Sequence, residues 1–285
     1  MTDSRNIGDL ERNKFYQQGV SNSEFALNIA TKHLIPIAKG GLSSYSHVNK
    51  FGRSVDVTTA IIDVAAMPAP VVYTWLEAPV QIEAISSDAG DVAVTGAGAR
   101  TIRVSGKDAN FNDVSADIDM AGLSASTATT QTFLRVERAY VLTAGRYAKT
   151  TAGSHIGTIT IRTKTAGATH IYIPVTPAAF GQSLVARYTI PAGYTGYLIE
   201  AFFSVDSLKT ADFTIFRRTN ADAVTAPYGT MRAIETFNGI DTPFPRSWDV
   251  PIKLEEKTDI WVSCIAAAGS TDVSASFDLL LIKDT

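Results

Sequence analysis

The 285-residue chain has a single cysteine, Cys264, and therefore cannot form an internal disulfide. Cys264 ends the alternating run Ile260, Val262 and Cys264, a pattern that predicts a buried strand residue rather than a nucleophile. The four histidines are scattered, and no G-x-S-x-G, P-loop or H-E-x-x-H motif occurs. A pair of carboxylates that cleaves a glycan is the remaining catalytic alternative, because spacing in sequence cannot reveal it. These absences predict a protein that is not an enzyme and that has no catalytic residue, cofactor or metal.

Long apolar runs and basic clusters are also missing. Even residues 60–75 are interrupted by Asp63, Pro68 and Pro70, so no segment has the length of a membrane helix. The first seven residues lack the basic and apolar parts of a secretory signal, which predicts a soluble product made in a cytoplasm. The formal net charge is -3, and the sequence has no run of Lys and Arg that could bind the phosphates of a nucleic acid. We therefore expect neither a membrane nor a nucleic acid as a partner.

The sequence does contain a long series of short alternating segments. Hydrophobic residues make up 45% of the chain, and 20 glycines with 11 prolines supply frequent turns. Apolar residues recur with a period of two in the ranges 134–142, 156–163, 170–175, 197–205, 213–215, 260–266 and 275–281. The pattern predicts an all-β protein with two antiparallel β-sandwich domains of jelly-roll or Ig-like type, residues 51–176 and 177–285. A single larger jelly roll is the alternative.

The stretch GAGARTIRVSGKDANFNDVSADIDMAG, residues 96–122, resembles a nucleotide-binding loop followed by a calcium loop. A nucleotide loop must open a helix, whereas apolar and polar residues alternate after Arg100 as in a strand. Asp108, Asn110 and Asn112 have the spacing of a calcium loop, but Asp113 stands where that loop needs glycine. The favoured interpretation is a β-hairpin with a polar turn, and the alternative is an adventitious cation site at residues 108–113.

Residues 1–50 differ from the rest and predict an N-terminal arm with short helices. One helix is expected over residues 9–18, and Ser21 with Glu24 forms a capping box for a second helix that stops before Pro36. Two short helices cannot form a core, so their apolar side chains must bury against the body of this chain or against a neighbouring subunit. The expected assembly contacts are Phe15, Tyr16, Phe25, Leu27, Ile29, Leu34 and Ile35.

A second candidate contact surface is FNGIDTPFPRSWDVP, residues 237–251. It is expected to be a loop that its prolines stiffen, and Phe244, Arg246 and Trp248 are residue types enriched in binding hot spots. The alternative is that the aromatic side chains cap the sandwich core while Arg246 pairs with Asp249. Trp261 lies opposite the apolar face of its own strand, so either a loop of this chain or a partner must cover it.

Four phrases resemble structural proteins of tailed bacteriophages, especially marine and cyanobacterial ones. They are FGRSVDVTTA (51–60), GAGARTIRVSGKDANFNDVS (96–115), TFLRVERAYVLTAG (132–145) and GTITIRT (157–163). They are strand and turn phrases rather than catalytic motifs. Lys107 stands where the related phrase has an apolar residue, a difference expected to concern a turn. The resemblance implies a virion component made in the host cytoplasm.

Three roles remain open for such a component. As a capsid decoration or cement protein, it would lay its arm across neighbouring subunits of a homo-oligomer, of which a trimer is one form, and contact virion proteins such as the major capsid protein. As a tail or neck protein, it would use the arm to link ring subunits. As a receptor- or carbohydrate-binding module, it would take a host-surface glycan at Trp248.

Overall fold

The computed structural model describes residues 36–67, 71–146, 153–176 and 179–284, and its regular elements from Tyr45 onward are all β-strands. Residues Val48–Thr285 form one compact unit and Met1–His47 another, and the description below concerns the first of these. Its strand pairs are antiparallel, which confirms the predicted all-β class. In the described ranges, no helix has the length and apolarity needed to cross a membrane.

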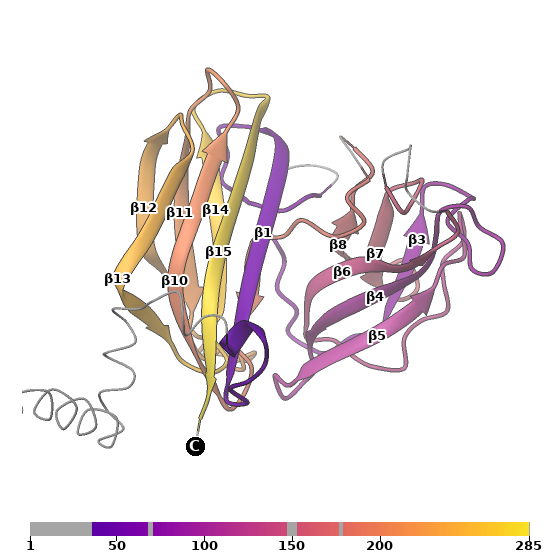
Figure 1. Ribbon diagram of the computed structural model, residues 1–285, viewed down its shortest axis with the longest axis horizontal. Helices are drawn as coiled ribbons and strands as arrows, with labels where there is room; N and C mark the ends of the chain where they lie inside the picture. Colours follow the sequence, from indigo (N-terminus) through magenta and orange to yellow (C-terminus); the bar gives the residue numbers. More distant parts are fainter. Residues whose placement is uncertain (1–35, 68–70, 147–152, 177–178, 285) are drawn as a thin grey trace, which may run out of the picture. The chain divides into compact units, whose positions relative to one another are not determined.

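The large sandwich has two sheets, with strand orders β1-β15-β10-β13 and β12-β11-β14-β2, and β9 also pairs with β14 (Figure 1). Its strands are β1 (Tyr45–Val57), β2 (Ile62–Asp63), β9 (Arg187–Thr189), β10 (Tyr194–Val205), β11 (Ala211–Arg218), β12 (Met231–Ile240), β13 (Phe244–Leu254), β14 (Asp259–Ala266) and β15 (Thr271–Lys283). Every second residue of β15 is buried, as expected of a strand with one face on a core. Phe203, Phe213 and Phe277 from both sheets meet in that core.

The small sandwich has two three-stranded sheets, with strand orders β3-β7-β8 and β5-β4-β6 (Figure 1). Its strands are β3 (Ile82–Ser86), β4 (Ala99–Lys107), β5 (Asp113–Asp119), β6 (Arg135–Ala144), β7 (Ile159–Thr163) and β8 (Thr169–Ile173). Its core is a separate cluster that includes Ile102, Phe133 and Ile161, each with no exposed surface. The hairpin expected in residues 101–120 is confirmed, because β4 and β5 pair from Thr101 and Asp119 to Lys107 and Asp113.

Two hydrogen-bonded segments connect the sandwiches. The chain leaves the large sandwich after β2 and returns to it at β9, and these crossings lie side by side: Ala66 N donates to Leu184 O at 2.8 Å, and Ala186 N donates to Val64 O at 2.9 Å. The small sandwich is therefore inserted between β2 and β9. The alternation pattern predicts that residues 51–63 belong to the first of two consecutive domains, whereas β1 and β2 pair with β15 and β14 of the large sandwich. Alternation locates strands but does not identify partners about 200 residues away.

Two further segments differ from expectation. Residues 45–50, assigned to the arm, form the first half of β1. Residues 237–251, expected to be a loop, belong mostly to β12 and β13, which are the outermost strands of their sheets. Pro245 and Pro251 are tolerated there because a proline has no backbone N–H to donate. One side of an edge strand has no partner strand that would need such a donor.

Candidate functional site

A cluster of buried charged side chains, called here the sandwich junction, joins the two sandwiches. Arg135 on β6 and Asp259 on β14 are 1% and 0% exposed. Arg135 Nε donates to Asp259 Oδ1 at 3.0 Å and Nη2 donates to Oδ2 at 3.2 Å, so the pair is bidentate. The remaining Arg135 bonds go to the carbonyls of Leu76, Leu134 and Ala221, which accounts for all five N–H groups.

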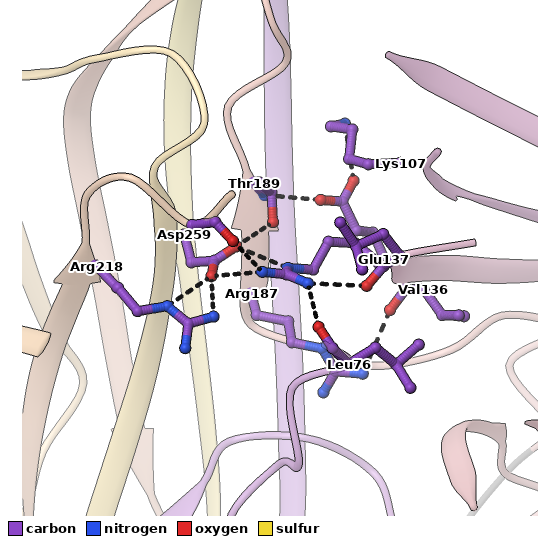
Figure 2. A network of polar contacts seen from close by, with 11 residues as sticks. Leu76, Lys107, Val136, Glu137, Arg187, Thr189, Arg218 and Asp259 are labelled. Carbon is purple, nitrogen blue, oxygen red and sulfur yellow. Dashed lines mark hydrogen bonds and ion pairs between the residues drawn. The ribbon is translucent and has the colours of Figure 1, made fainter. Parts of the chain in front are cut away.

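Asp259 also holds two groups of the large sandwich (Figure 2). Thr189 Oγ1 donates to Asp259 Oδ1 at 2.7 Å, and Arg218 Nε donates to Oδ2 at 3.1 Å. Two guanidinium groups therefore share one fully buried carboxylate. Buried ion pairs offset a desolvation cost of several kcal/mol only when their hydrogen bonds are well satisfied, as those of Arg135 and Asp259 are.

Glu137 extends the junction toward the small sandwich (Figure 2). Its Oε1 accepts from Thr189 N at 2.7 Å, and its Oε2 accepts from Lys107 Nζ at 3.0 Å. Lys107, only 1% exposed, also donates to Asp113 at 2.6 Å and lies 4.3 Å from the centroid of the Tyr188 ring. Burial would lower the pKa of Lys107, but attraction to Glu137, Tyr188 and Asp113 outweighs it and raises that pKa. Lys107 is thus a charged member of the junction, which corrects the expectation that it concerns only a turn.

A β-bulge in β6 brings these side chains to the junction. The register of β4 and β6 shifts between Ser105 and Gly106, which leaves Glu137 without an opposite residue on β4. Gly106 is needed at this point, since a Cβ would lie 1.8 Å from Arg135 O. Because the bulge interrupts the alternation, Arg138 is exposed, although the sequence pattern puts it on the apolar face.

The loop segment 73–76 covers the junction. The Trp75 ring lies over both arginines, 5.1 Å from Arg135 Cζ and 5.0 Å from Arg218 Cζ. Trp75 also packs against Trp261 with 5.3 Å between ring centroids, and Trp261 is only 5% exposed. Of the two alternatives for Trp261, the covering loop is therefore correct. The prediction that Trp261 contacts a partner is wrong, because this chain already buries it.

Arg187 on β9 forms the other end of the junction. Its Cζ lies 3.5 Å from the centroid of the Tyr73 ring, and Nη2 donates to His170 O at 2.8 Å. Burial and the Arg187 charge lower the pKa of His170 to about 4, so this imidazole is neutral at neutral pH. Its Nε2 is hydrogen-bonded to Thr163 Oγ1 at 2.9 Å.

A serine, a histidine and an aspartate do lie near one another, but they are not connected as a catalytic triad. Ser86 Oγ donates to Asp91 Oδ2 at 2.6 Å, while His155 bonds to backbone through both nitrogens, to Gly157 O at 2.8 Å and Gly181 N at 3.3 Å. Asp91 has no exposed surface and also accepts three backbone N–H groups, from residues 99, 156 and 157. None of these contacts joins the serine to the histidine, and Asp91 instead anchors the backbone of three loop residues.

Asp91 also explains the glycine-rich opening of residues 96–122. A Cβ on Gly98 would lie 2.0 Å from Asp91 Oδ1, so glycine is required for the carboxylate to fit. Gly98 therefore makes room for a buried aspartate, whereas Gly96 lies against backbone atoms of Gly90 and Val92.

The Asp and Asn residues that follow form a turn in which a side chain accepts hydrogen bonds from the turn's own backbone. Asp108 Oδ1 accepts from the backbone N–H of Asn110 at 2.8 Å and of Asn112 at 2.9 Å. Asp113 is paired with Lys107. These contacts support the polar-turn interpretation, and no group of three or more possible metal ligands occurs in the part of the chain that is described.

The candidate surface of residues 237–251 is a pair of edge strands joined by side chains. Arg246 Nε and Trp248 Nε1 donate to Glu235 Oε2 at 3.1 Å and 3.0 Å. Trp248 packs partly into the large core, and Arg246 Cζ lies 5.1 Å from the centroid of its ring. The expected partner of Arg246, Asp249, is therefore replaced by Glu235. Phe244 is 37% exposed.

The predicted arm contacts Phe15, Tyr16, Phe25, Leu27, Ile29, Leu34 and Ile35 lie outside the described residues. The sequence analysis did not single out Arg135, Glu137, Arg187 or Asp259. The available signal was charge inside otherwise apolar strands, in LRVER (134–138) and LVARYTI (184–190).

An open groove of about 460 Å³ is lined by Arg53, Val55, Met67, Ile85, Tyr172 and Leu184, among others. Its lining is mostly apolar, and the Arg53 guanidinium is already paired with Asp272 at 2.7 Å. The groove therefore offers no evident acid, base or nucleophile pair.

Comparison with known proteins does not identify a family for this chain. No protein-family model matches the chain, and no curated protein matches it. Among solved structures, a VP2 subviral particle of infectious bursal disease virus is 11% identical, with 84% of this chain and 72% of that chain covered and a TM-score of 0.23. A structure of the Gt strain of that virus is 9% identical, with 84% of this chain and 75% of that chain covered and a TM-score of 0.19. TM-scores this low do not establish a common fold.

Proposed function

We propose that this chain is a non-enzymatic structural component of a phage virion. The observation that carries the proposal is the sandwich junction, in which buried charges hold two β-sandwiches in one arrangement. Charged groups that bind one another inside the protein are typical of a structural protein. An enzyme instead needs an acid, base or nucleophile directed at a substrate. The phrases that resemble tailed-phage structural proteins coincide with β1, the β4–β5 hairpin, β6 and β7.

Within the virion, the most specific role we propose is that of a capsid decoration or cement protein. Residues 1–35 would act as an arm between subunits, because they carry many apolar side chains and precede every strand. Burial of about 25 cal/mol per Å² of apolar surface between chains would then stabilise the shell. The partners would be further copies of this chain and the major capsid protein.

Copy number in purified virions tests this role. We expect hundreds of copies per particle on a calibrated protein gel, and density for the chain on the outside of the shell in an image reconstruction. About a dozen copies, with density at the tail or neck, would replace the decoration role by a tail role. Absence of the chain from purified particles would overturn the proposal of a virion protein altogether.

A further inference from the structure

Lys50 on β1 is a buried lysine at the sandwich junction, and a nearby carboxylate only partly balances its positive charge. It is 7% exposed, and its Nζ donates to the backbone carbonyl of Glu137 at 2.7 Å. This hydrogen bond links β1 of the large sandwich to β6 of the small one. A neutral amine can also make this hydrogen bond, because it keeps N–H donors.

The charges around Lys50 oppose its protonation. The nearest anion is the Glu137 carboxylate, whose oxygens already accept from Thr189 N and Lys107 Nζ. The cations acting on Lys50 are Arg187 on β9, Lys107 on β4 and Arg138 on β6.

One aromatic ring also faces the site. Lys50 Nζ lies 5.9 Å from the centroid of the Tyr188 ring, whereas Lys107 lies closer, at 4.3 Å. Lys107 therefore has the better access to both the carboxylate and the ring. Lys50 is the cation that the cluster accommodates least well.

We propose that Lys50 makes the sandwich junction pH-sensitive, so that the contact between the sandwiches strengthens as Lys50 loses its proton in the neutral to mildly alkaline range. Burial, reinforced by the neighbouring cations and only partly offset by Glu137, lowers the pKa of Lys50 from 10.5 to about 7. The unfolded chain thus binds a proton that the folded chain releases, so stability rises with pH between about 7 and 10.5. This behaviour is independent of the virion role.

Equilibrium unfolding of the full chain in urea between pH 6 and pH 9 tests the proposal. From the two pKa values, the unfolding equilibrium constant of the wild type should fall roughly 50-fold from pH 7 to pH 9. Lys50→Met keeps the length of the side chain without the charge and should remove most of that fall. Lys253→Met, at an exposed position on β13, is the matched control and should follow the wild type. Parallel curves for wild type and Lys50→Met would overturn the proposal.

A second measurement covers the case in which Lys50→Met does not fold. The lysine Cε resonances of ¹³C-labelled wild-type protein can be followed by NMR over the same pH range. We expect one of them to titrate near pH 7. If every lysine resonance titrates above pH 9, the proposal is refuted without any variant.

Discussion

Arg135 and Asp259 are 124 residues apart in the sequence, yet they form a bidentate ion pair with a shortest N–O distance of 3.0 Å in the interior of the protein. One belongs to the small sandwich and the other to the large sandwich. The pair therefore fixes how an inserted domain meets the domain that contains it.

Removing the charge of Asp259 should be strongly destabilising. In Asp259→Asn, Arg135 and Arg218 stay buried or half-buried without their shared carboxylate. We expect a loss of about 3–5 kcal/mol in the free energy of unfolding, measured in urea at pH 7. Asp249→Asn, at an exposed position, is the control and should change stability by less than about 0.5 kcal/mol. Equal effects of the two variants would show that the junction has no energetic role.

Gly98→Ala tests the explanation of the glycine-rich stretch. The new Cβ would lie 2.0 Å from Asp91 Oδ1, so either the carboxylate or the loop must move. A loss of about 1–3 kcal/mol, visible as a lower melting temperature, is the expected result. Gly269→Ala is the matched control, because nothing lies within 4 Å of its added Cβ. A melting temperature for Gly98→Ala like that of the control would contradict this account.

Trp248→Ala separates a structural from a receptor-binding role of the β12–β13 edge. The indole donates to Glu235 and packs against the large core, so we expect a less stable protein. Host adsorption of particles that carry the variant should be unchanged under the decoration proposal. Tyr228→Ala removes an exposed aromatic group outside this edge and serves as the comparison. Loss of adsorption by intact Trp248→Ala particles alone would favour the receptor- or glycan-binding role.

Deletion of residues 1–35 tests the arm. The fifteen strands found in the described residues begin at Tyr45 or later, so the truncated chain keeps them and should give a β-type circular dichroism spectrum. We expect it to be missing from purified virions, because the apolar residues proposed to contact neighbouring subunits are gone. Incorporation at the normal level would rule out an assembly role for the arm.

The strands themselves follow from the local sequence. The alternation in β4 and β5 predicted their hairpin, and the run ending at Cys264 predicted a buried thiol, which is 1% exposed and whose pKa burial raises to about 12. Both predictions succeed because a period of two depends only on which neighbours along the chain face the same side.

Local patterns account for the all-β class, for the positions of most strands and for the turn around Asp108. The folded chain was needed to show that β1 and β2 pair with C-terminal strands, that segment 73–76 covers Trp261, and that Lys107 and Arg135 are buried. A charged side chain is stable in the interior only beside an oppositely charged partner. That partner, Asp259 for Arg135, comes from a distant segment that no local pattern identifies.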